Sequence, residues 1–232
     1  MTPSAALVLL AAGTGTRSGL ATNKVFAVLA GRRVLTWSLD ATRDVAGIGP
    51  VLVVVRAGEA ETAERVLREE SPGREVNVVA GGATRHASER NALEAIRSAV
   101  DDGRVDVVVI HDAARPLAPA AVFTAVIAAA RLHGGAVPGR LQHGLLRRDD
   151  LSPYAGDVLV VQTPQAFGAR LLLDAHDAAA ADGFEGTDTA ACVERFSPGL
   201  SIHALPGPAA NLKITFPEDL ALAERLLARL AR

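Results

Sequence analysis

A glycine-rich segment near the N-terminus has the residue types needed to bind an anionic ligand. Gly13 and Gly15 allow backbone N–H groups to converge on a phosphate, and Arg17 and Lys24 add two positive charges. The P-loop pattern is absent, because no Gly-Lys-Ser or Gly-Lys-Thr occurs in the chain. The same glycines, with Gly19, would also suit a dinucleotide-binding turn or a plain strand-to-helix connection, so several kinds of site remain open.

A second glycine pair lies farther along the chain. Gly81 and Gly82 allow a flat base or a sugar to approach the backbone, and the hydroxyl of Ser88 can supply a hydrogen bond. The alternatives are a simple turn, a helix cap at Ser88 and a structural or solvated ion pair at Arg85.

An aspartate stands at the end of an apolar run, in the segment His111-Asp112-Ala113-Ala114-Arg115-Pro116. Because Mg²⁺ binds nucleotide phosphates through one or two carboxylates plus water, Asp112 is the predicted metal ligand. We expect His111 to be a structural, hydrogen-bonded residue, since attack by a phosphate oxygen requires no proton removal. Arg115 would contact a ligand or pair with a neighbouring carboxylate.

Only two of the 24 basic residues are lysines, Lys24 and Lys213. Positions that keep lysine in such an arginine-rich chain are candidates for sites that need a compact, flexible ammonium group. Lys213 lies in Asn211-Leu212-Lys213-Ile214-Thr215, and a further polar segment, Gln162-Thr163-Pro164-Gln165, ends an apolar run. Ligands of open α/β sheets bind beyond the carboxyl ends of the strands, where these residues are predicted to lie.

Composition excludes several classes of protein. The chain has 232 residues, 49% of them hydrophobic, and a formal net charge of −2, which argues against nucleic acid or an anionic membrane as the main partner. The apolar run 5–12 is too short to span a bilayer. Cys192 is the only cysteine, so no intramolecular disulfide can form, and we expect a cytoplasmic protein.

Short β-branched runs alternate with longer amphipathic stretches, which predicts βαβ units. The expected fold is α/β, with a Rossmann-like, mostly parallel sheet, helices on both faces and a protruding arm around residues 139–156. We expect one domain over residues 1–232. Predicted strands cover residues 6–10, 51–55, 76–80, 105–110, 135–138, 158–162 and 201–205; predicted helices cover residues 34–42, 59–69, 87–100, 119–132, 169–181 and 187–194. A last helix starts near Pro217, where Thr215 and Glu218 have capping-box spacing.

In their order and spacing, these segments resemble the 2-C-methyl-D-erythritol 4-phosphate cytidylyltransferase family of the non-mevalonate isoprenoid pathway. The resemblance covers nearly the whole chain, and both lysines fall on positions that are functional in the family. It rests on Ala11-Ala12-Gly13-x-Gly15-x-Arg17, Lys24, Gly81-Gly82-x-x-Arg85-x-x-Ser88, and the segments 111–116, 162–165 and 211–215.

The resemblance implies a single nucleotidyltransferase domain that uses Mg²⁺, in which a sugar-alcohol phosphate attacks the α-phosphorus of CTP and pyrophosphate leaves. By this likeness Arg17 and Lys24 stabilise the developing charge, and Lys213 holds the acceptor phosphate. Asp112 would hold the metal. Contacts with CTP are assigned to Ala11, Ala12, Gly13, Gly15, Gly82, Ser88 and Asp112. A homodimer is also implied, because in the family the arm completes the neighbouring subunit's acceptor site.

Departures from the family concentrate in the arm. The usual Asp-Thr pair after the fifth strand is replaced by residues 138–143, and the arginine that positions the acceptor has no evident counterpart. We therefore expect Arg140, Arg147 or Arg148 to supply acceptor charge, with Arg115 as a further acceptor contact. Asn23 replaces the usual proline before Lys24, and Thr189 replaces an acidic residue.

Three alternatives accompany this interpretation. A cytidylyltransferase for another polyol phosphate, such as ribitol 5-phosphate, would share the nucleotide motifs, and a weakly active paralogue would bind nucleotide without turnover. A nicotinamide-dependent oxidoreductase would suit the glycines, with Arg56 meeting a 2′-phosphate. The last alternative is disfavoured, because Val158 stands four residues after the only tyrosine, Tyr154, where a Tyr-x-x-x-Lys pair requires lysine.

Overall fold

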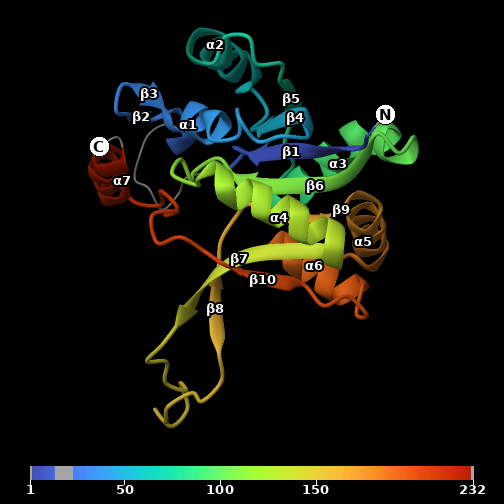
Figure 1. Cartoon of the computed structure of the whole chain (residues 1–232), viewed down its shortest axis with the longest axis vertical. Helices are drawn as coiled ribbons and strands as arrows, with labels where there is room; N and C mark the ends of the chain where they lie inside the picture. The colour runs from blue at the N-terminus through green and yellow to red at the C-terminus, as the bar shows by residue number, and fades with distance from the viewer. Residues whose placement is uncertain (1, 14–22, 231–232) are drawn as a thin grey trace.

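The structure, a computed structural model, describes residues 2–13 and 23–230. Gly15 and Arg17, two of the predicted site residues, lie outside the described residues. Figure 1 shows a central sheet with helices on both faces and a two-stranded arm that extends away from the body. The predicted α/β class, mostly parallel sheet and protruding arm are therefore confirmed.

In the described part of the chain the main sheet has eight strands, in the order β10-β7-β9-β6-β1-β4-β5, with β8 paired to β7. The pairs β1–β4, β1–β6, β4–β5 and β7–β10 are parallel, whereas β8 and β9 run antiparallel to their neighbours. The strands are β1 (Ser4–Leu10), β4 (Ile48–Val55), β5 (Asn77–Ala80), β6 (Val105–Asp112), β7 (Gly135–Gln142), β8 (Val158–Val161), β9 (Gln165–Gly168) and β10 (His203–Pro206). A separate ribbon pairs β2 (Val28–Leu29) with β3 (Arg32–Arg33).

Helices cover the two faces of the sheet in sets of three. One face carries α1 (Val34–Asp40), α2 (Ala60–Glu70) and α4 (Ala120–His133); the other carries α3 (Arg85–Asp101), α5 (Ala169–Asp182) and α6 (Thr189–Phe196). The central strand β1 serves both cores, with Leu7 and Leu9 on the first side and Ala6 and Val8 on the second. This alternation follows from the two-residue period of a strand. No helix in residues 2–13 and 23–230 combines the length and apolarity needed to cross a bilayer.

The predicted strand 158–162 corresponds to β8 alone, and the sequence did not indicate β9. Residues 165–168 read Gln-Ala-Phe-Gly, a short run without a β-branched residue, which gives no strand signal by itself. β9 forms because it lies between β6 and β7, where Ala166 and Phe167 are fully buried. Tertiary packing therefore decides its conformation.

The arm is built from the outer half of β7 and from β8. β7 continues to Gln142, past the predicted end at Pro138, and pairs with β8 from Gly139 opposite Val161 to Gln142 opposite Val158. A further bridge joins Leu146 to Pro153. Figure 1 shows this ribbon pointing away from the helical layers.

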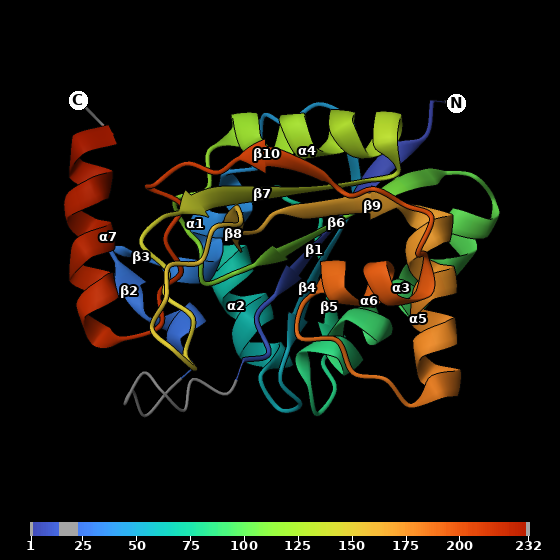
Figure 2. The same ribbon diagram turned by 90° about the horizontal axis from the view of Figure 1, so that it is seen from below.

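The last helix, α7 (Pro217–Leu230), lies at one end of the molecule beside β2 and β3 (Figure 2). The prediction of a capping box formed by Thr215 and Glu218 is wrong, because the acid that binds the backbone at this helix start is Asp219 and not Glu218. Oδ2 of Asp219 accepts hydrogen bonds from the N–H groups of Thr215 (2.7 Å) and Phe216 (2.8 Å). A carboxylate near the first turn satisfies backbone donors that have no partner within the helix. α7 is thereby fixed to the segment that carries Lys213.

We expect Asp219→Ala to lower the free energy of unfolding by about 1 kcal/mol, because two backbone donors lose their acceptor. Urea denaturation measures this loss. Glu218→Ala is the matched control, since Glu218 accepts neither of these two bonds, and it should change stability by much less. Equal losses in the two variants would contradict the assignment of Asp219 as the capping residue.

Candidate active site

Strand register brings the predicted site segments together at one edge of the sheet. Asp112 ends β6 directly opposite Leu10, the last residue of β1. The next backbone groups continue the ladder, because Ala11 N–H donates to Val54 O (2.7 Å) and Ala113 N–H donates to Leu10 O (3.0 Å). The segments that follow neighbouring strands therefore meet at their carboxyl ends, as expected for a ligand site in an open α/β sheet.

These segments enclose a cavity of about 520 Å³. A volume of this size is typical of a small-molecule site. Its lining includes seven of the predicted site residues: Ala12, Gly13, Lys24, Gly82, Ser88, Asp112 and Lys213. Asn23, Thr84, Arg85 and Thr215 also line it, although none of them was among the predicted contacts.

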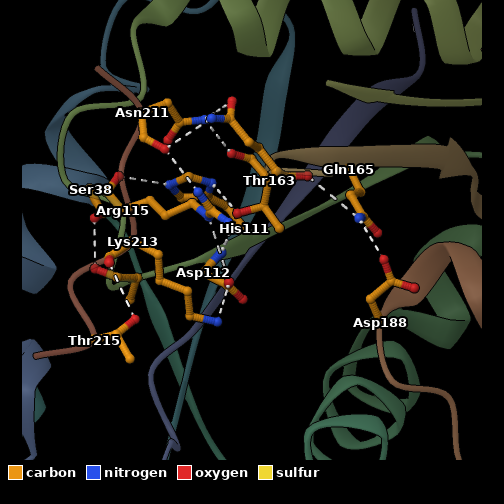
Figure 3. A network of polar contacts seen from close by, with 12 residues as sticks. Ser38, His111, Asp112, Arg115, Thr163, Gln165, Asp188, Asn211, Lys213 and Thr215 are labelled. Atoms are coloured by element: carbon orange, nitrogen blue, oxygen red, sulfur yellow. Dashed lines mark hydrogen bonds and ion pairs between the residues drawn. The ribbon is translucent and has the colours of Figure 1, made fainter. Parts of the chain in front are cut away.

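Three cationic side chains surround the carboxylate of Asp112, a residue that is only 8% exposed. Lys213 Nζ donates to Oδ2 at 2.7 Å (Figure 3), Arg85 Nη2 lies 3.5 Å from Oδ1, and Arg115 Nε lies 3.8 Å from Oδ2. Burial alone raises the pKa of Asp112, but the charges of Lys213, Arg85 and Arg115 outweigh it and hold the pKa well below its usual value. The carboxylate is therefore ionised throughout the physiological pH range.

Behind Asp112, a chain of hydrogen bonds fixes the turn from 111 to 115. The N–H of Asp112 donates to Thr163 Oγ1 (2.9 Å), which lies 3.1 Å from His111 Nδ1. His111 Nε2 lies 3.2 Å from the carbonyl oxygen of Arg115, so this nitrogen carries the proton and Nδ1 accepts from Thr163. Burial lowers the pKa of His111 to about 4, and the ring is neutral. His111 therefore has the structural place predicted for it.

The segment that carries Lys213 is tied to the same turn (Figure 3). Ile214 N–H donates to Ala114 O (2.8 Å), and the side-chain amide of Asn211 donates to Thr163 O (2.9 Å). Asn211 thus binds backbone, one of the two roles left open by the sequence. The backbone carbonyl oxygen of Asn211 accepts from Arg115 Nη1 (2.8 Å), so the guanidinium of Arg115 bridges two segments. Arg115 does not line the cavity.

Gly82 and Ser88 form a compact corner before α3. The N–H of Gly82 donates to Ser88 Oγ (3.1 Å), whose hydroxyl donates to Thr84 O (2.8 Å). Thr84, and not Ser88, caps the helix, since its hydroxyl oxygen accepts from Ala87 N–H (3.1 Å). A Cβ at Gly82 would overlap with Ala87, so the close approach requires glycine.

Lys24, which also lines the cavity, begins a short 3₁₀ helix, η1 (Lys24–Phe26). The buried amide of Asn23 donates to Ala11 O (2.7 Å) and to Glu59 Oε2 (2.9 Å). Asn23 therefore joins the start of η1 to the end of β1 and to the residue before α2. Ala11 is fully buried, with its N–H and carbonyl in protein hydrogen bonds, so it forms the wall behind the cavity.

Arg85 is held by a carboxylate that the sequence analysis did not single out. Glu89 is fully buried one turn along α3 and pairs with Arg85 Nη1. Thr189 Oγ1 donates to the same carboxylate oxygen at 2.9 Å and lies 3.3 Å from Arg85 Nη1. The i, i+4 spacing of Arg85 and Glu89 is the sequence feature that could have indicated this pair. Residues four apart lie on the same side of a helix, and an acid buried there requires a cationic partner.

Arg140 is the predicted residue that the structure leaves farthest from this arrangement. It is exposed on the part of β7 that forms the arm, opposite Val160 of β8, and it does not line the cavity of its own chain. The expectation that Arg140 contacts the acceptor stays a prediction.

The described cavity lining offers cations and backbone donors on several sides and one carboxylate, that of Asp112. Such a set suits a ligand with several negative charges. It also fits Mg²⁺, which commonly binds through one protein carboxylate together with ligand phosphates. The arrangement can therefore position phosphate groups and neutralise charge that develops on them.

Comparison with known proteins gives a consistent set of matches. The family model for 2-C-methyl-D-erythritol 4-phosphate cytidylyltransferase matches residues 5–229. The enzyme of that name from Cereibacter sphaeroides (strain ATCC 17029 / ATH 2.4.9) is 37% identical, over 96% of this chain and 96% of its own. The bifunctional enzyme IspD/IspF of Rhodobacter capsulatus is 39% identical over 96% of this chain, which spans only 55% of that relative. A solved structure, 4-diphosphocytidyl-2C-methyl-D-erythritol synthase from Anaerococcus prevotii, superimposes with a TM-score of 0.81 at 26% identity and covers 98% and 97% of the two chains.

We expect Glu89→Gln to weaken CTP binding about tenfold and to lower the free energy of unfolding by roughly 3 kcal/mol, because Arg85 loses its buried partner. Calorimetric titration and urea denaturation measure the two effects. Adding Thr189→Asp should restore most of the affinity, since position 189 lies within reach of Arg85.

Glu94→Gln on the same helix is the control, because Glu94 is exposed and pairs with Arg97 instead. CTP affinity that is unchanged in Glu89→Gln, or a double variant no better than the single one, would contradict this role of Glu89.

Proposed function

Because the chain belongs to the 2-C-methyl-D-erythritol 4-phosphate cytidylyltransferase family, we propose that it transfers CMP from CTP to 2-C-methyl-D-erythritol 4-phosphate. An oxygen of the acceptor phosphate forms a bond to the α-phosphorus of CTP, and the bond from that phosphorus to the leaving pyrophosphate breaks. The nucleophile is already an anion, so the reaction needs no general base.

The observation that carries this proposal is the gathering of Lys24, Lys213, Arg85 and Asp112 around one cavity at the carboxyl ends of β1, β5 and β6. Nucleotidyl transfer depends mainly on positioning and on neutralising negative charge, both of which fixed cations provide. Gly82 and Ser88 also line this cavity, where a base or sugar would contact the corner before α3.

Within this proposal the two lysines act on different groups. Lys24, with Arg17, stabilises charge on the α-phosphorus and on the leaving pyrophosphate. Lys213 binds the acceptor phosphate; its side chain is 42% exposed and contacts Asp112 at 2.7 Å. The buried carboxylate of Asp112 thus sets where this ammonium group lies before a substrate arrives.

Asp112 is also the residue that would hold Mg²⁺. When bound, the ion would neutralise charge on the triphosphate and help to orient it. Asp112 would then contact both the ion and Lys213, which links nucleotide binding and acceptor binding through a single side chain.

Arg140 and Arg115 are assigned to the acceptor in different ways. Arg140 on the arm would contact it directly, and it is available to a neighbouring subunit because it is exposed on a projecting ribbon. Arg115 would act through Asp112, from which its Nε lies 3.8 Å, because its side chain does not line the cavity. Because residues 138–143 of the arm depart from the family pattern, the identity of the acceptor is what the experiment must test. Ribitol 5-phosphate is the alternative acceptor.

The proposed function is tested by pyrophosphate release from CTP and Mg²⁺ with methylerythritol, ribitol, erythritol and glycerol phosphates. We expect turnover with methylerythritol phosphate. Turnover only with another polyol phosphate would assign the enzyme to that acceptor, and CTP binding without turnover would identify a nucleotide-binding paralogue.

Lys213→Met should lower kcat/KM for the acceptor by about 100-fold while the KM for CTP stays near its wild-type value, because the variant removes only the acceptor's cation. Initial rates with each substrate varied separately measure this. Arg229→Met, on the exposed side of α7, is the charge-matched control and should behave as wild type. A larger effect on CTP than on the acceptor would contradict the role assigned to Lys213.

We also propose a cytoplasmic homodimer joined through the arm. The arm exposes a set of large apolar side chains whose burial would favour association. They are Leu141, Leu146, Leu151, Tyr154, Leu159, Val160 and Val161. The unpaired Cys192 is in keeping with a reducing compartment.

Val160→Asp should convert the dimer to a monomer in sedimentation experiments, since Val160 is 52% exposed on β8. Val28→Asp is the matched control, because Val28 is 50% exposed but lies on β2, away from the arm. A wild-type protein that sediments at 24.0 kDa would contradict the proposal, as would a Val160→Asp variant that remains dimeric.

A further inference from the structure

Behind the Gly82 corner, three helices bring two histidines and the only cysteine together. His86 comes from the first turn of α3, His176 from α5 and Cys192 from α6. Their exposed fractions are 7%, 1% and 0%. One ligand atom from each of the three side chains lies within 4.8 Å of the others. None of these side chains takes part in the proposed reaction.

The polar atoms of this cluster are poorly satisfied. Within residues 2–13 and 23–230, His86 Nδ1 and both ring nitrogens of His176 are buried without a hydrogen-bond partner, and so is Glu89 Oε2. Leaving a buried polar atom without a partner costs about 1 to 3 kcal/mol. His176 Nε2 and Glu89 Oε2 lie 3.3 Å apart, which leaves His86 Nδ1 and His176 Nδ1 as the two ring nitrogens with no neighbour of this kind. Two such buried nitrogens in one place indicate a bound species that the protein atoms alone do not supply.

We propose that His86, His176 and Cys192 bind a divalent metal ion of the zinc type. Imidazole nitrogen and thiolate sulfur are the donors that Zn²⁺ prefers, and the ion would give partners to the two histidines. The three residues come from separate helices, so the ion would join α3, α5 and α6 on one face of the sheet. Its role would be structural.

Glu89 completes the arrangement as an orienting residue. Its Oε2 lies 3.3 Å from His176 Nε2. Histidines that bind metals usually donate their other ring N–H to a carboxylate, which fixes the ring and leaves the first nitrogen free for the ion. His176 would then bind through Nδ1. The other oxygen of Glu89 pairs with Arg85, so the metal site and the cavity share one buried carboxylate.

Binding requires a small local movement. The ligand atoms of the three side chains lie within 4.8 Å of one another, whereas a tetrahedral zinc ion separates its ligand atoms by roughly 3.3 to 3.8 Å. The rings of His86 and His176 are stacked, so closing this difference would shift the stack.

The test uses tag-free protein, stripped with a chelator and titrated with Zn²⁺ or Co²⁺. We expect one Zn²⁺ per chain to remain after gel filtration and Tm to rise by several degrees. Because Cys192 is the only cysteine, a thiolate-to-cobalt charge-transfer band in the wild-type protein would by itself place the ion at this residue. This readout needs no variant that could fail to fold, and it does not depend on turnover.

Cys192→Ser and His176→Asn should lower Zn²⁺ affinity about tenfold or more and abolish the rise in Tm. His203→Asn is the control, since His203 stacks with His133 in a second histidine pair outside the cluster and lacks a cysteine neighbour. Absence of the cobalt–thiolate band, or equal Zn²⁺ affinity in wild type and Cys192→Ser, would overturn the proposal.

Discussion

Burial of the Asp112 carboxylate at the end of β6 is the constraint that the rest of the site satisfies. An ionised carboxylate that leaves water must be compensated, and its loss of hydration is costly unless cations lie close by. Lys213, Arg85 and Arg115 supply that compensation from three different segments. The same requirement that stabilises the fold therefore brings these cations together at a cavity.

Each of the three cations is held in turn by the surrounding fold. The position of Lys213 is fixed because segment 211–215 is hydrogen-bonded to Ala114 and to the first turn of α7. Arg85 is held by its ion pair with Glu89, and Arg115 by its hydrogen bond to the backbone carbonyl oxygen of Asn211. In a phosphate-transferring site such preorganised charges act without reorganising during the reaction, which is the physical basis of the proposed activity.

Much of this arrangement could be predicted from the sequence, because strand ends and glycine pairs have local signals. The positions of Gly82, Asp112 and Lys213 at one cavity followed from the βαβ pattern and the family resemblance. β9 and the support of Arg85 by Glu89 could not be predicted in the same way, since both depend on contacts between distant segments. The contact of Thr189, which occupies a position where the family resemblance predicts an acidic residue, is a further example. Its hydroxyl donates a hydrogen bond to Glu89 on α3.

The most direct test of the central role of Asp112 is the rate of pyrophosphate release by Asp112→Asn, measured at saturating CTP, acceptor and Mg²⁺ on protein shown by circular dichroism to be folded. If this carboxylate organises the cations and holds the metal, the rate should fall by about 100-fold or more, and further Mg²⁺ should not restore it. A folded Asp112→Asn enzyme that turns over near the wild-type rate would contradict the account.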